Sequence, residues 1–245
     1  MSRRAPACLL ALAVLCCRAP LAAQEPFSPK NLQILPRDID RQALMESMQG
    51  FAAALDVRCD HCHAQDAQGG PRLDFAADTK ETKKVTRAMM RMAQTINDTL
   101  LPRTGRTNLL SVECATCHHG LARPQALQAA LRTAYQQGGL DSAVAAYQEL
   151  RTRYYGRAAY DFGEPSLVTV GRDFLASKDV DAAARFLQMN LEYFPRSADT
   201  YVQLSEVSRA RGDRDAARQY LQQALGIEPD NRGIRRRLDA VDHAE

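Results

Sequence analysis

Two short runs, CDHCH at residues 59–63 and CATCH at residues 114–118, constrain this chain more than any other feature. Each has the pattern Cys-x-x-Cys-His. In this pattern two thiols can bond the two vinyl groups of a haem, and the following histidine can bind its iron from one side. The runs therefore predict two covalent c-type haems. The predicted attachment and proximal residues are Cys59, Cys62 and His63 for the first, and Cys114, Cys117 and His118 for the second.

A structural zinc site is the alternative for the same cysteines, since two Cys-x-x-Cys pairs can form a tetrahedral four-thiolate cage. Such a cage has no use for a histidine directly after each second cysteine, and both runs have one. The three cysteines outside the runs, Cys8, Cys16 and Cys17, lie in the first 20 residues. Haem is therefore favoured over zinc, and no cysteine of the mature chain is left for a disulfide.

The first 23 residues have the pattern of a secretory signal peptide. Arg3 and Arg4 form a charged start, residues 7–17 are apolar, and Ala22 and Ala23 offer a cleavage point. The apolar run is too short to span a bilayer comfortably. An uncleaved anchor is the alternative, and it leaves peripheral membrane association open. A periplasmic or other extracytoplasmic location agrees with covalent haem attachment, which in bacteria takes place outside the inner membrane.

Charge and composition exclude some partners and indicate the fold class. Cleavage after residue 23 removes three arginines and no acids from 32 basic and 29 acidic residues, so the mature chain is neutral. Haem propionates would make it somewhat acidic, which argues against nucleic-acid binding because that binding depends on clustered Lys and Arg. The chain has no Trp and is rich in Ala, Leu, Gln and Arg, which favour helices. An all-α fold is predicted.

Each Cys-x-x-Cys-His run is preceded by a segment with helical periodicity. Asp38 or Asp40 can cap a helix over residues 41–55, and Thr79 can cap a second helix over residues 80–98. Each segment has one apolar face. The faces consist of Leu44, Met48, Phe51 and Leu55 in the first helix, and of Val85, Met89, Met92 and Ile96 in the second.

Methionines on these two helices are candidates for the sixth position of each iron. A Met thioether is the usual way to close that position and raise the potential. A methionine on an amphipathic helix more often fills a core, but both helices precede a haem run. The candidates are Met45 and Met48 in the first helix and Met89, Met90 and Met92 in the second. His61, His119 and His243 are interpreted as bystanders.

The segments MQGFAAALDVRCDHCH, RAMMRMAQTIND and VECATCHHGLARP resemble the cytochrome c subunit of photosynthetic reaction centres and its smaller two-haem relatives. The resemblance covers about residues 31–124. For each haem it implies a helix with the distal Met, a turn, and a second helix with the Cys-x-x-Cys-His run. It implies Met48 as the distal ligand of the first haem and Met92 of the second, with Met45 and Met89 as runners-up. The subunit typically has four haems and this chain has two, so photosynthesis does not follow from the match.

Residues 125–245 repeat with a period of 34. The sequences DVDAA at 179–183 and DRDAA at 213–217 are 34 residues apart, as are Pro195 and Pro229. This helix-turn-helix period resembles the tetratricopeptide repeat. A degenerate earlier copy is predicted over residues 126–154, with Gly138 and Gly139 at its turn, and a capping helix over residues 231–242. The repeats either bind a protein partner on a concave surface or pack on the haem domain as additional core.

The predicted protein is an exported dihaem cytochrome, with the haem domain over residues 24–124, that passes electrons between a redox protein donor and acceptor. No catalytic residue is predicted. A dihaem peroxidase-like enzyme is the first alternative. It requires an open or releasable sixth position and nearby acid–base groups, and Glu113 is the only ionisable residue immediately before the second run. A scaffold built on the repeats, with structural or sensory haems, is the other.

Overall fold

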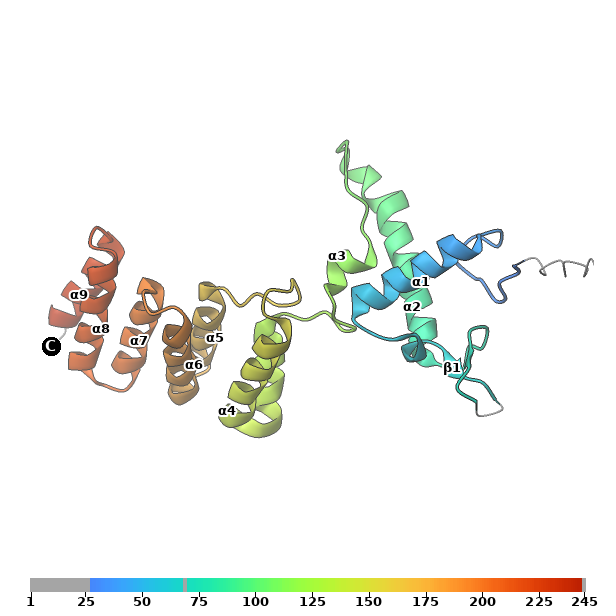
Figure 1. Ribbon diagram of the computed structural model, residues 1–245. Helices are drawn as coiled ribbons and strands as arrows, with labels where there is room; N and C mark the ends of the chain where they lie inside the picture. The colour runs from blue at the N-terminus through green and yellow to red at the C-terminus, as the bar shows by residue number, and fades with distance from the viewer. Residues whose placement is uncertain (1–26, 68–69, 244–245) are drawn as a thin grey trace, which may run out of the picture.

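The structure is a computed structural model that describes residues 27–67 and 70–243. The predicted signal peptide at residues 1–23 lies outside the described residues. Figure 1 shows two parts, one containing α1 to α3 and the other a row of helices from α4 to α9. The strands in the described part of the chain are two residues long, β1 at Ala64–Gln65 and β2 at Leu73–Asp74, and they pair antiparallel. The prediction of an all-α fold is confirmed.

Helix α1, Arg41–Leu55, has the predicted bounds. Its first turn is capped by Asp40, whose carboxylate accepts a 2.8 Å hydrogen bond from the Ala43 N–H. Its end is set by Asp56, which has left-handed backbone angles and donates its N–H back to the last turn. The local sequence alone accounts for this helix.

Helix α2 spans Glu81–Thr95 and continues into a π-helical turn, η2, at Ile96–Leu100. The prediction that Thr79 caps this helix is wrong. Lys80 occupies the cap position without a side-chain cap, and its ammonium group instead donates to the Asp60 carbonyl. The residue at the start of α2 therefore contacts the first Cys-x-x-Cys-His run instead of capping its own helix.

The two runs adopt different local structures. The second forms a short helix, α3, at Cys114–His118, after the 3₁₀ turn η3 at Pro102–Thr104. The first forms only a 3₁₀ turn, η1, at Cys59–His61. The resemblance implied a helix for both. The first cannot continue, because two residues after Cys62 the chain enters β1, which pairs with β2.

The second part is a series of helical hairpins. Helix α4, Leu127–Tyr154, is interrupted at Gly138 and Gly139, so it is the hairpin that the degenerate first repeat predicts. Gly139 has φ 71° and ψ −162°, a region essentially restricted to glycine. The next hairpins are α5 (Glu164–Ala176) with α6 (Val180–Tyr193) and α7 (Ala198–Ala210) with α8 (Arg214–Ile227), and α9 (Arg232–His243) follows.

The 34-residue period is visible in the helix caps. Asp179 accepts from the Ala182 N–H at 3.0 Å, and Asp213 accepts from the Ala216 N–H at 2.9 Å. Helix α9 buries Ile234 and Val241 in a cluster with residues of α7 and α8, which fits the predicted capping role. The spacing of caps thus places equivalent helices one hairpin apart.

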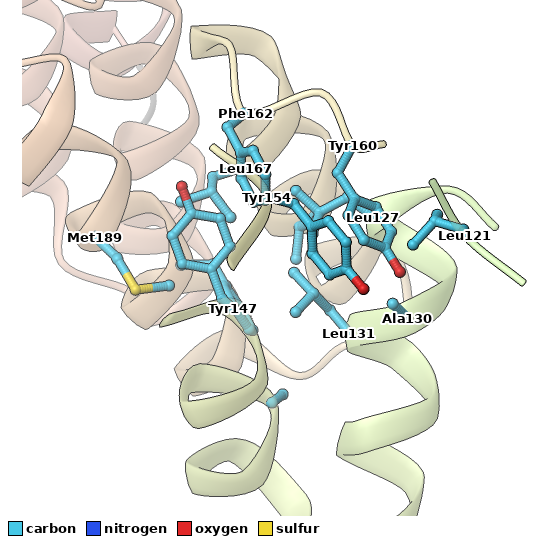
Figure 2. Close-up of a cluster of buried hydrophobic side chains, with 13 residues drawn as sticks. Leu121, Leu127, Ala130, Leu131, Tyr147, Tyr154, Tyr160, Phe162, Leu167 and Met189 are labelled. Carbon is cyan, nitrogen blue, oxygen red and sulfur yellow. The ribbon is translucent and has the colours of Figure 1, made fainter. Parts of the chain in front are cut away.

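Buried apolar side chains lie almost entirely in the second part. Figure 2 shows the largest cluster, in which Tyr154 meets Tyr160 edge to face at 5.4 Å between ring centroids. Between residues 27 and 120, Ala54 is the only buried apolar side chain of the described chain. Large apolar side chains of that stretch are instead exposed: Phe27, Met45, Phe75, Val85, Met89, Met92, Leu100, Leu109 and Leu110. This arrangement fits a domain that packs around large bound groups.

The two parts are joined through the segment after α3. Gly120 donates its N–H to the Ala54 carbonyl at 2.9 Å, and the next residue, Leu121, is buried in the cluster of α4 and α5. Arg153 forms an exposed ion pair with Asp56 at 3.2 Å across the same junction. Among the residues that the structure describes, none of the helices has the length and apolar character that a membrane crossing requires.

Candidate haem sites

The first run is held on the N-terminal half of α2. Thr82 donates its hydroxyl to the His61 carbonyl, and the Thr86 hydroxyl lies 3.7 Å from the Cys62 sulfur. Thr82 and Thr86 are four residues apart, so they lie on one face of the helix. Cys59 is exposed and Cys62 half-buried, which leaves both thiols near the surface where a haem vinyl group can reach them.

The second run is held on the C-terminal end of α1. Helix α3 packs against α1, and the Gly120–Ala54 hydrogen bond closes this contact. The segment before the run is attached to the π-helical turn η2. Asn97 donates to the Val112 carbonyl at 2.9 Å and accepts from the Val112 N–H at 2.7 Å. Burial raises the pKa of the Cys114 thiol. Each run is thus supported by the helix that precedes the other run.

The imidazole of His118 is oriented for iron binding through Nε2. Its Nδ1 lies 2.7 Å from the Leu121 carbonyl oxygen. A carbonyl can only accept, so Nδ1 carries the proton and Nε2 keeps its lone pair. Metal-binding histidines usually make this kind of hydrogen bond with the nitrogen that does not face the metal. The second run therefore has the donor set that a c-type haem needs.

The imidazole of His63 is also suited to iron binding, but its surroundings differ. Its buried Nδ1 has no hydrogen-bond partner, and its ring meets the Phe75 ring edge to face at 5.0 Å. Burial, and after it the charge of Lys83, lowers the pKa of this imidazole. A neutral imidazole is the form that binds iron.

The candidate methionines lie on the two helices as the periodicity predicts. Met48 is half-buried on α1, whereas Met45 is 52% exposed and lies off the apolar face. On α2, Met89 and Met92 are exposed and Met90 is half-buried. Val85 and Met89 lie three residues after Thr82 and Thr86, so they adjoin the threonine face that holds the first run, and Met92 lies three residues beyond Met89.

A cationic cluster next to His63 has no counterpart in the motifs. Lys83 is buried, and its ammonium group donates to the Phe75 carbonyl at 2.9 Å and to the Ala77 carbonyl at 2.7 Å. It also lies 3.1 Å from the Asp78 carboxylate, which pairs with Arg87 at 2.8 Å. Nothing in the sequence distinguishes Lys83 from the exposed neighbour Lys84, so sequence reasoning could not find this site.

Residues 23–163 match the family model described as "Photosynthetic reaction centre cytochrome C subunit". The match covers more than half of the 245 residues and includes both runs, α1 to α3, and the hairpin α4. No curated protein matches the chain.

Proposed function

The chain belongs to the photosynthetic reaction centre cytochrome c subunit family, and from that premise we propose that it is an exported dihaem cytochrome relaying electrons between two redox proteins. The family establishes a haem-binding electron-transfer cytochrome. The presence of two complete runs supports a count of two haems. The N-terminal signal pattern supports export to the periplasm or another extracytoplasmic space.

The hydrogen bond from His118 Nδ1 to the Leu121 carbonyl carries this proposal. The 2.7 Å contact between Nδ1 and the Leu121 carbonyl oxygen orients the ring and leaves Nε2 as a lone-pair donor in the same run as two thiols. A four-thiolate zinc cage would not need this histidine orientation. His63 contributes an imidazole whose lowered pKa keeps it neutral.

Packing of the runs supports the assignment of Met48 to the first haem and Met92 to the second. Each haem would need the side of its run that no helix covers. The helix that covers a run would then be less well placed to supply the distal ligand of that haem. The first run contacts α2 and the second contacts α1. The methionine of each unit's own helix is thus the better placed one, with Met45 and Met89 as runners-up.

The residues of the chain have a limited role in the proposed reaction. When bound, the haems supply the one-electron redox change. Cys59, Cys62, Cys114 and Cys117 would anchor them, His63 and His118 would bind the irons, and Met48 and Met92 would close the sixth positions. Closed sixth positions favour electron transfer over peroxide chemistry. We place the haem domain at residues 24–124 and the repeats, which offer a surface for a protein partner, at 125–245.

Production of the full chain in cells with a haem-attachment system tests the proposal. The intact mass of the exported protein should exceed that of the polypeptide by two haems. The reduced protein should bind carbon monoxide poorly and turn over peroxide slowly. A haem-free protein with bound zinc would refute the cytochrome, and rapid peroxide turnover would refute the carrier in favour of the peroxidase-like alternative.

A further inference from the structure

The proximal sides of the two candidate haem sites are not equivalent. His118 donates its Nδ1 proton to the Leu121 carbonyl at 2.7 Å. His63 Nδ1 is buried without a hydrogen-bond partner, although the Phe75 carbonyl is close enough to favour the protonated ring. A strong hydrogen bond from Nδ1 makes the imidazole more basic and stabilises ferric iron. This effect favours a lower reduction potential at the second site.

Lys83 competes with the first imidazole for the Phe75 carbonyl. Its ammonium group donates to the Phe75 carbonyl at 2.9 Å and to the Ala77 carbonyl at 2.7 Å. The Phe75 carbonyl is thus polarised by a cation and is a weaker acceptor for the imidazole. Lys83 also fixes the backbone of Phe75, whose ring packs on the His63 ring.

The charge around Lys83 is not balanced within its cluster. Lys83 is 8% exposed, and Lys83 and Arg87 share the single carboxylate of Asp78. Asp74 also faces His63, but it is exposed, accepts the N–H groups of Ala76 and Ala77, and has the weakest influence on the imidazole. Lys83, Arg87 and Asp78 together carry one net positive charge close to the first proximal histidine, and the exposed Asp74 offsets it only weakly there. Such a charge stabilises ferrous over ferric iron, because reduction removes one positive charge from the haem.

We propose that Lys83 is a positioning residue that makes the first haem the higher-potential site, so that an electron arriving at the second haem passes to the first. In that step the second iron is oxidised from ferrous to ferric and the first is reduced from ferric to ferrous. The inference rests on the proposed function. It adds an internal direction of electron flow, from the CATCH site to the CDHCH site.

Redox titration of the full-length haem-loaded protein, followed optically, tests this. Two waves are expected. Lys83→Met removes a positive charge and should shift the higher wave downward. Asp78→Asn removes a negative charge from the same cluster and should shift the same wave upward. Both substitutions break contacts of one network, so a purely structural role would not give shifts of opposite sign. Lys84→Met is the matched control, since Lys84 is exposed and forms its ion pair with the exposed Glu81.

The possible outcomes separate the inference from the function on which it rests. A shift of the lower wave by Lys83→Met, equal shifts from Lys83→Met and Lys84→Met, or shifts of the same sign from Lys83→Met and Asp78→Asn would overturn the inference. If one variant does not fold, the other still tests the inference through the direction of its potential shift and through which of the two waves shifts. Unmutated protein without two redox-active haems would overturn the proposed function itself.

Discussion

At the residue scale, the sites depend on a few side chains with distinct roles. In the proposed sites the cysteines would anchor the haems and the histidines would bind iron. The Leu121 carbonyl orients His118, and Lys83 holds the backbone of Phe75, whose ring packs on His63. Sequence periodicity places the candidate distal methionines on a helix but does not identify which methionine is the ligand. Substitution of single methionines can identify it.

Met48→Ala should convert the first haem, and Met92→Ala the second, to a high-spin or water-ligated form with a lower potential. The reason is the loss of the thioether, which prefers ferrous iron. Optical and electron paramagnetic resonance spectra with a redox titration measure both changes. Met45→Ala and Met89→Ala serve as matched controls one turn away. The assignment is wrong by a turn if the controls give the change and the named variants do not.

Asp78 should make the stability of the haem domain sensitive to acid. Its pKa is lowered well below the usual range, first by its bond with Arg87 and then by the side chain of Asn31. A lowered folded-state pKa gives stability that is complete above the unfolded value, roughly 3.9, and that is lost as pH falls through the folded value.

The melting temperature of unmutated protein should therefore decrease as the pH is lowered below about 4. Asp78→Asn should make this decrease smaller and should also lower stability at neutral pH. Thermal unfolding of both proteins at pH values from roughly 3 to 7, which include the range of ordinary carboxyl titration, measures this pH dependence. Asp66 is unsuited as a control because it has its own contacts; exposed Asp38 is suitable. An unchanged acid limb in Asp78→Asn would contradict the prediction.

At the scale of elements, close packing between α5 and α6 limits what the repeat can tolerate. Gly171 lies on α5 where a Cβ atom would come within 2.6 Å of Leu187 Cγ on α6. The equivalent residue one period later is Ser205, which is buried and donates its hydroxyl to the Val202 carbonyl. A 34-residue period therefore preserves a small side chain at this helix contact.

Gly171→Ala should lower the free energy of unfolding by about 1–3 kcal/mol, because the added methyl group overpacks the contact with Leu187. Denaturant unfolding followed by circular dichroism measures the change. Gly226→Ala is the matched control, since Gly226 is helical and a Cβ there meets nothing within 4 Å. The control should gain up to about 1 kcal/mol. Equal effects of the two variants would contradict the packing argument.

At the scale of the whole molecule, Leu121 connects the second candidate haem site to the helical hairpins of the second part. Its carbonyl accepts from His118, and its side chain is buried among residues of α4 and α5. The repeat core thus holds the loop that orients the second proximal histidine. This arrangement gives the repeats a structural role whether or not they also bind a partner.

Leu121→Ala should destabilise the junction by about 2–5 kcal/mol, because it leaves a cavity in the repeat core. Haem absorbance and far-ultraviolet circular dichroism should report unfolding at one temperature in the unmutated protein and at two separate temperatures in the variant. Leu110→Ala, at an exposed side chain, is the control and should leave the repeat transition unchanged. Coincident transitions in Leu121→Ala would contradict the prediction, because they would show that the two parts remain coupled without this side chain.

The sequence by itself determined the features that depend on near neighbours in the chain. The spacing of thiols and histidine in each run, a cap of α1 at Asp38 or Asp40, and the 34-residue period all act over short distances or regular repeats, and the structure selects Asp40 as the cap. The structure confirms two predictions of this kind, the bounds of α1 and the turn at Gly138 and Gly139.

Only the tertiary structure decided which distant residues meet. It placed each run on the helix that precedes the other, buried Lys83 and left Lys84 exposed, and tied Leu121 to the repeats. At the start of α2, where Thr79 was predicted as the cap, the Lys80 side chain likewise contacts a carbonyl 20 residues earlier in the chain. Such contacts join segments that are far apart in the sequence, and no periodic pattern of residues indicates them. Lys83 is buried because the fold brings backbone carbonyls to its ammonium group, which the sequence does not show.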